Sequence, residues 1–139
     1  RQRQMCIRDS QNMTMRFSVA GQKILVTGDA SKYNVDEMCD RYGEYLKSDI
    51  MTVPHHGWNE NRYRARNGTV EFYRFVDPVY VMWPDGDAAQ QKKMQWDGVS
   101  GSNWEANYYL INSLHVKELY VAGSVTKTFV LPYSGSANQ

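Results

Sequence analysis

The sequence has little cysteine, no long apolar run and almost no excess of charge of one sign. Its 139 residues include two cysteines, Cys6 and Cys39, whose separation fits neither a disulfide framework nor a zinc ribbon. No run of about eighteen apolar residues is present, so no segment is predicted to span a membrane. The formal net charge is only +1, which disfavours nucleic acid as a partner because such proteins usually show a clear basic excess.

The first ten residues, RQRQMCIRDS, show neither helical nor strand periodicity. Residues 5–10 (MCIRDS) also resemble a translated sequencing adapter, so we expect residues 1–10 to be an adapter-like or disordered tail outside the fold. Without their three arginines and one aspartate, the balance of 16 − 15 = +1 becomes 13 − 14 = −1. A single domain is predicted over residues 11–133, with a small polar tail over 134–139.

Strand and helix patterns alternate along the remaining chain, which predicts the α/β class with a mixed sheet flanked by helices. Gly21-Gln22 is read as the turn of a β-hairpin, and Cys39 as a packed thiol within a helix. The predicted strands are 14–20, 23–27, 49–53, 78–83, 116–122 and 126–131; the predicted helices are 36–46, 70–76 and 103–114; and the predicted loops are 55–69 and 84–102.

Two segments place metal-binding side-chain types directly after predicted strands. Asp29 follows the strand 23–27, and His55 and His56 follow the strand 49–53. The 55 − 29 = 26 positions from Asp29 to His55 leave room for one helix, so we expect the two strand ends to lie side by side. A carboxylate and an imidazole there form part of a zinc-type site. On pattern alone, a turn or cap role for the aspartate and a surface role for the histidines stay open.

The order of these motifs resembles that of metallo-β-lactamase-fold hydrolases. Residues 12–14 read NMT, residues 27–29 read TGD, and residues 46–57 read LKSDIMTVPHHG. The later segments VDPVYVMW (76–83) and VKELYVAG (116–123) are also similar to the branch that contains DNA-uptake competence proteins and phosphorylcholine esterases. The resemblance covers about residues 11 to 133. It implies the C-terminal half of an αββα sandwich.

The resemblance also implies roles for the strand-end residues. Asp29 corresponds to a carboxylate that bridges two metal ions, and one of His55 and His56 corresponds to a later ligand. We favour His55 as the ligand and His56 as the catalytic neighbour that moves a proton. The implied cofactor is zinc, with two ions in the full-length protein, and the implied reaction is hydrolysis of an ester or phosphodiester.

Two departures from the family pattern change what is expected. The main metal motif HxHxDH is absent, as is the separate histidine that usually precedes TGD. If the adapter interpretation is right, both would lie in a missing upstream part, and the chain alone is expected to be inactive. The later histidine after the strand 78–83 is also absent: Asp85 or Asp87 is a substitute, or a solvated turn residue, and His115 looks unrelated.

Two further residues are candidates for contact with substrate. Arg62 lies in the loop after the histidines and could bind a phosphate, and Trp96 lies in the long loop 84–102. The expected partner is thus a small-molecule or phosphoester substrate. A catalytically silent binding or interaction module of the same fold is the alternative. Oligomeric state stays open, as does the compartment, cytoplasm or bacterial cell surface.

Overall fold

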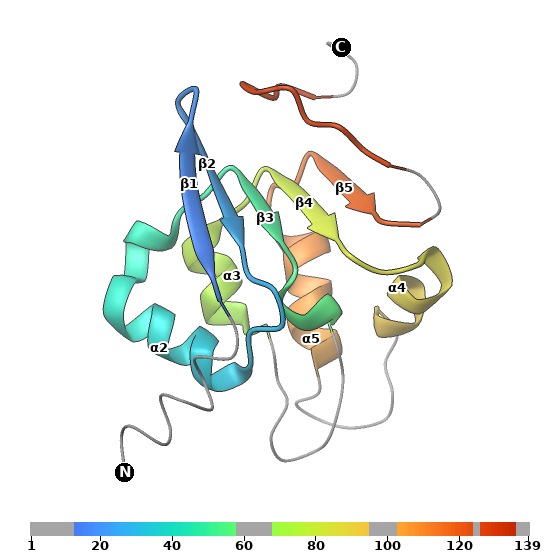
Figure 1. Ribbon diagram of the computed structural model, residues 1–139. Helices are drawn as coiled ribbons and strands as arrows, with labels where there is room; N and C mark the ends of the chain where they lie inside the picture. The colour runs from blue at the N-terminus through green and yellow to red at the C-terminus, as the bar shows by residue number, and fades with distance from the viewer. Residues whose placement is uncertain (1–12, 58–67, 95–102, 124–125, 136–139) are drawn as a thin grey trace.

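The computed structural model describes residues 13–57, 68–94, 103–123 and 126–135. Five strands form one mixed sheet in the order β1-β2-β3-β4-β5, with helices packed against it (Figure 1), which confirms the α/β class. The strands are β1 (Met15–Val19), β2 (Gln22–Val26), β3 (Ile50–Thr52), β4 (Tyr80–Trp83) and β5 (Glu118–Val121). The α-helices are α2 (Lys32–Tyr42), α3 (Val70–Val76), α4 (Asp87–Lys93) and α5 (Asn103–Tyr108); 3-10 turns cover Gly43–Leu46 and Pro54–Gly57, and a π-helical turn covers Tyr109–Ser113.

The predicted hairpin is present, but its turn lies one residue earlier than expected. β1 pairs with β2 antiparallel, with Val19 opposite Gln22, so the two turn residues are Ala20 and Gly21. Their φ angles are 50° and 77°, and a turn with two positive φ angles matches the right-handed twist of the flanking strands. Gln22 therefore belongs to the second strand and not to the turn.

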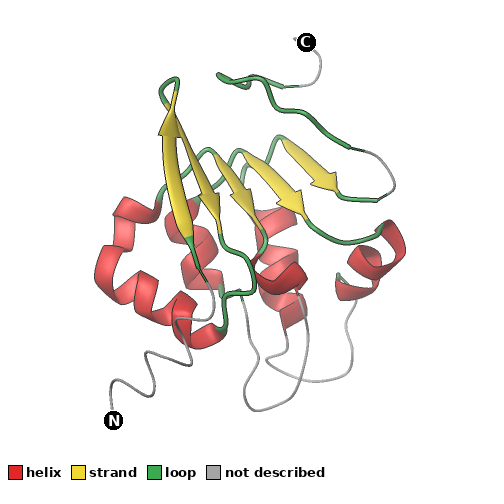
Figure 2. Ribbon diagram, in the orientation of Figure 1, coloured by secondary structure: helices red, strands yellow, loops and turns green. Residues whose placement is uncertain are grey.

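The helices α2, α3 and α5 lie on one face of the sheet (Figure 2). β2, β3, β4 and β5 are parallel, and their order in the sheet follows their order in the chain. Right-handed crossovers that always step in the same direction place every connecting helix on the same side. Within the described residues the other face receives no crossover helix, which leaves its covering to a different part of the chain.

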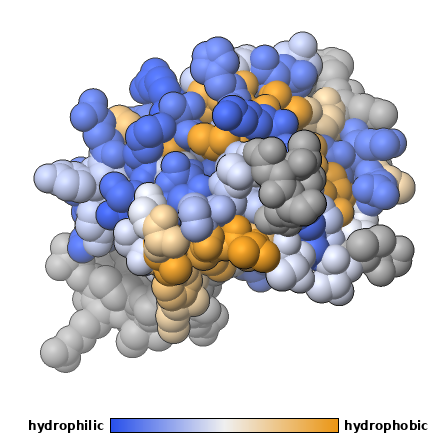
Figure 3. All heavy atoms as spheres, turned by 90° about the horizontal axis from the view of Figure 1, so that it is seen from above, coloured by the Kyte–Doolittle hydropathy of each residue, from blue (hydrophilic) through white to orange (hydrophobic). Residues whose placement is uncertain are grey.

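Both faces of the sheet carry apolar side chains, and each has its own core. On the helix side the core includes Met51, Val81 and Trp83, with Leu110 from the π-helical turn, all at most 1% exposed. On the other side Ile50 and Tyr80 pack against residues of the C-terminal segment 126–135. That segment covers only part of the second face: Phe17 and Val19 of β1 each remain 45% exposed. Figure 3 looks onto the molecule from above and shows apolar side chains at its surface.

Three element predictions are corrected. The helix predicted over 36–46 begins at Lys32, because Ser31 and Asn34 form a capping box, and it passes into a 3-10 turn at Gly43. The predicted loop 84–102 contains the helix α4. The predicted strand 126–131 has no strand structure in the part that is described, residues 126–131. Its alternating apolar residues, Phe129 and Leu131, pack down onto the second sheet face and do not extend the sheet.

The other elements agree with the sequence within a few residues, and Cys39 is a free, buried thiol in α2. Burial raises the pKa of the Cys39 thiol to about 12, with nearby carboxylates adding to the effect. Among the described helices, none has the length and apolar character needed to cross a membrane.

Candidate functional site

The candidate site lies where three neighbouring parallel strands end. β2 leads into residues 27–30, β3 leads into Pro54–Gly57, and β4 leads into residues 84–86. The backbone N–H of His55 donates to the carbonyl of Gly28 at 2.8 Å, which fixes the first two loops against each other. The expectation that the strand ends before Asp29 and before the histidines lie side by side is therefore confirmed.

A buried threonine anchors the loop that presents Asp29. Thr27 is fully buried; its backbone N–H donates to Thr52 Oγ1 at 2.9 Å, and its hydroxyl donates to the Thr52 carbonyl at 2.8 Å. Gly28 then turns the chain with a φ of 54°. The Asp29 side chain remains 66% exposed, so its carboxylate is held at the sheet edge without being withdrawn from solvent.

The histidine turn has an unusual backbone. His55, His56 and Gly57 have φ angles of 47°, 56° and 64°, so three successive residues adopt the left-handed conformation that non-glycine residues avoid. Two buried side chains hold this turn: Trp83 Nε1 donates to the His56 carbonyl at 2.9 Å, and Asn107 Nδ2 donates to the Gly57 carbonyl at 3.1 Å. Strain of this kind persists only where the surroundings hold it, and it is concentrated at functional sites.

The structure brings His56 and Asp29 together. His56 Nε2 lies 3.5 Å from Asp29 Oδ1, and the other ring nitrogen, Nδ1, makes a short hydrogen bond with the Pro84 carbonyl. A carbonyl can only accept, so Nδ1 carries a hydrogen, and Nε2 is the ring nitrogen that faces Asp29. A metal-ligating histidine commonly has this arrangement, in which a backbone carbonyl fixes the ring.

The spacing of the two donors fits a shared zinc ion. With metal–ligand distances of about 2.0–2.1 Å, two ligands of a tetrahedral site lie about 3.4 Å apart, close to the observed separation of Nε2 and Oδ1. The donor set is nevertheless small. Among the described residues, no group of three or more His, Cys, Asp or Glu side chains is arranged to hold a metal ion. Asp29 and His56 therefore supply two ligands, fewer than a structural or catalytic zinc site needs.

The remaining predicted site residues are placed as follows. The ring of His55 lies beside that of His56, with centroids 6.2 Å apart. Asp85 accepts a hydrogen bond from the Gly86 N–H at 2.9 Å, and Asp87 begins α4, so both take part in local turn and helix structure. Arg62 and Trp96 lie outside the described residues.

Sequence reasoning missed the residues that support the histidine turn. Trp83 was predicted as the last residue of the strand 78–83; the structure shows that it is fully buried and that its ring lies against Gly57. Asn107 is also buried, and nothing in its helix pattern indicates that it reaches the Gly57 carbonyl. A tryptophan at the end of a strand next to the PHHG strand was the one available signal, because its N–H needs a partner when it is buried.

Comparison of the chain with protein-family models, with curated proteins and with solved structures found no match.

Proposed function

We propose that this chain forms part of a metal-dependent hydrolase of the metallo-β-lactamase fold, with zinc as the metal and an ester or phosphodiester as the substrate. The observation that carries the proposal is the Asp29–His56 pair at adjacent strand ends, with its two donor atoms 3.5 Å apart. The TGD and PHHG motifs supply these residues in the order expected from the family resemblance.

The two histidines take different parts in this proposal. His56 is the better candidate ligand, because the Pro84 carbonyl fixes its Nδ1–H and leaves Nε2 directed at Asp29. The sequence alone favoured His55 as the ligand, and that prediction is untested. In the present proposal the roles are exchanged, and His55 is the neighbour that transfers a proton. A bound zinc ion would supply Lewis-acid activation of water for attack on the ester or phosphodiester.

In this proposal the chain forms one sheet-and-helix layer of a larger αββα sandwich. The second sheet face supports this view, because it is apolar and the segment 126–135 covers only part of it. Largely parallel sheets normally have both faces covered. Two ligands do not make a dinuclear centre, so the remaining ligands are expected to come from an upstream part, and the chain alone is expected to be inactive.

A catalytically silent binding module of the same fold is the second candidate. It is favoured by the segment after β4, where Asp85 bonds to its own turn and residues 84–102 contain no histidine. An intact HxHxDH motif in an upstream part would support the hydrolase, and a degenerate motif would support the silent module.

Cobalt titration tests the proposed ligand pair in the chain as it stands. Co²⁺ absorbs visible light according to its ligands, so a histidine–carboxylate site should give a saturable spectrum. Asp29→Asn and His56→Gln should each abolish that spectrum. The matched controls, Asp40→Asn and His115→Gln, alter exposed residues outside the strand-end loops and should leave it unchanged. Equal spectra for all four variants would show that Asp29 and His56 do not bind the metal.

A second experiment tests the proposed zinc content and hydrolase activity. A version of the protein extended by the upstream coding sequence should contain zinc by elemental analysis and should hydrolyse bis-p-nitrophenyl phosphate or p-nitrophenyl phosphorylcholine. The Asp29→Asn and His56→Gln versions of that protein should lose most of the zinc. An extended protein that folds but contains no zinc would rule out the metallohydrolase and leave the silent module.

A further inference from the structure

The strand β1 has one free edge in the part of the chain that the structure describes. It stands first in the sheet order and pairs only with β2. In a hairpin with a two-residue turn, the residues flanking the turn exchange hydrogen bonds, and the pairs then alternate. Val19 and Phe17 therefore direct their backbone groups towards β2, while Arg16 and Ser18 direct theirs outwards. A row of outward N–H and C=O groups is a template for another strand.

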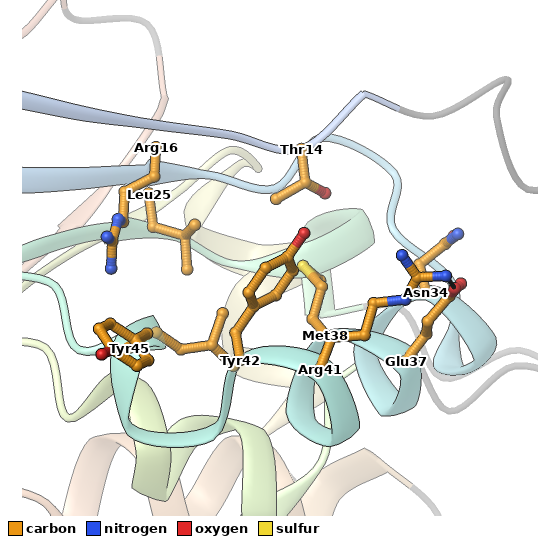
Figure 4. Close-up of a pocket in the computed structure, with 10 residues that line it drawn as sticks. Thr14, Arg16, Leu25, Asn34, Glu37, Met38, Arg41, Tyr42 and Tyr45 are labelled. Carbon is orange, nitrogen blue, oxygen red and sulfur yellow. Dashed lines mark ion pairs between the residues drawn. The ribbon is translucent and has the colours of Figure 1, made fainter.

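A groove runs beside this edge, between β1 and α2 (Figure 4). Its volume is about 450 Å³, and its floor is apolar, with Leu25 and Leu46 nearly fully buried. The rings of Tyr42 and Tyr45 stand on the helix side, and Arg16 extends from β1 towards Tyr45. The same residue, Arg16, thus offers outward backbone groups to a strand and a side chain to the groove.

The charges around the groove favour an acidic group. Arg41 lines the groove but pairs with Glu37 at 2.7 Å on the same helix, which neutralises it locally. Arg16 makes no ion pair among the described residues. A carboxylate that approaches along the β1 edge would therefore meet an uncompensated guanidinium, which binds carboxylates with favourable geometry.

We propose that β1 and α2 form a peptide-binding groove, in which an extended, acidic segment of a partner protein adds to β1 as a sixth strand. An acidic side chain lies opposite Arg16, and an apolar side chain two positions away lies opposite Thr14, which also lines the groove. Main-chain hydrogen bonds supply the affinity, and the alternate side chains supply the specificity. The proposal does not depend on metal binding or hydrolysis.

The shape of the groove favours a peptide over a small molecule. Tyr45 is 79% exposed and Tyr42 is 53% exposed, so the helix-side wall is open to solvent. Sites for small molecules usually bury about 70–90% of the ligand surface. An extended peptide needs no such enclosure, because the free strand edge holds its backbone.

Fluorescence anisotropy with two labelled heptapeptides tests the proposal on the full chain. The probe TVTETVT places valine, glutamate and valine on the groove side, and the control TVTKTVT replaces the glutamate by lysine. The glutamate peptide should bind at least about tenfold more tightly, and Arg16→Glu should reverse this preference. Lys117→Glu makes the same charge change at an exposed lysine just before β5, the opposite edge strand, and should have no effect.

A backbone variant separates strand addition from simple charge attraction. Ser18→Pro removes an outward N–H without removing a β1–β2 hydrogen bond, so it should weaken both peptides while the far-ultraviolet circular dichroism stays native. Absence of binding at millimolar peptide, equal binding of the two peptides, or an unchanged affinity in Ser18→Pro would each overturn the proposal. Dimerisation of the chain that Ser18→Pro abolishes, without peptide binding, would assign the edge to a second copy and would also overturn it. None of these results depends on the cobalt spectrum, so this proposal and the metal site fail separately.

Discussion

Gly57 is the residue where the histidine turn leaves no room for a side chain. A Cβ atom added there would lie 2.3 Å from Cζ2 of Trp83, and the residue also has a φ of 64°. Trp83 cannot yield easily, because it is fully buried and its N–H holds the His56 carbonyl. One glycine thereby allows the tryptophan ring to support the turn that presents the histidines.

We predict that Gly57→Ala lowers the free energy of unfolding by about 2–4 kcal/mol, since it combines a backbone penalty with overpacking. Gly21→Ala is the matched control: Gly21 has a φ of 77°, but nothing lies within 4 Å of an added Cβ. It should cost only about 1 kcal/mol. Urea unfolding followed by circular dichroism measures both values. Equal losses in the two variants would mean that the ring of Trp83 moves aside freely.

At the scale of elements, the start of α2 depends on a local polar arrangement. The Ser31 hydroxyl accepts from the backbone N–H of Asn34, and the Asn34 side chain accepts from the Ser31 N–H at 3.0 Å. These two bonds satisfy donors that would otherwise be unpaired at the helix end. α2 covers Leu25 and also forms one wall of the proposed peptide groove. Its position therefore affects both the burial of Leu25 and the shape of the groove.

We predict that Ser31→Ala lowers the free energy of unfolding by about 1 kcal/mol, as expected for the loss of a helix cap. Thr69→Ala should have a similar effect, because the Thr69 hydroxyl accepts from the Phe72 N–H at 3.1 Å at the start of α3. The exposed Ser113 supplies the control, and Ser113→Ala should change stability by less than about 0.5 kcal/mol. Should Ser31→Ala match that control in a urea titration, the cap would not determine where α2 begins.

Elements with a clear apolar period were predictable from the sequence, and elements defined by tertiary contacts were not. The hairpin, β3, β4 and α3 follow from strand alternation and helix spacing. The segment 126–131 alternates like a strand, yet Phe129 and Leu131 use that alternation to pack across the second face. α4 is short and polar, so its sequence carries no apolar stripe to indicate a helix.

The candidate site was predictable in part for the same reason. The positions of Asp29 and His56 after adjacent strands follow from the chain order, because parallel strands end at one edge. Which histidine ring faces Asp29 depends on the left-handed turn and on the Pro84 carbonyl. Both are tertiary features, so the sequence left that choice open.

At the scale of the whole molecule, the main feature is the difference between the two faces of the sheet. The helix face carries the larger core, whereas in the described part of the chain the second face is covered by the segment 126–135. Phe17 and Val19 remain about half exposed on that face. An apolar surface of this kind promotes association in a chain that carries it openly.

We predict that replacing Phe17 and Val19 together by lysine reduces self-association of the chain, measured by sedimentation velocity, and reduces binding of the dye ANS. The free energy of unfolding should fall by no more than about 1–2 kcal/mol, because both side chains are already half exposed. The control replaces Tyr33 and Tyr108, which are 56% and 50% exposed on helices, by lysine. If the control reduces association as strongly, added charge and not the sheet face would be responsible.

The burial of Cys39 makes its alkylation rate a measure of how often α2 separates from the sheet. Only a thiolate reacts with alkylating reagents, and this thiol is 6% exposed with a pKa raised to about 12. In a chain with Cys6 replaced by serine, every alkylation event at pH 8 must therefore wait for α2 to leave the sheet. The slow rate of labelling, divided by the rate for an unfolded chain, then reads the equilibrium between closed and open forms. Mass spectrometry of a timed labelling series would follow how often this layer opens, under native conditions and without a denaturant.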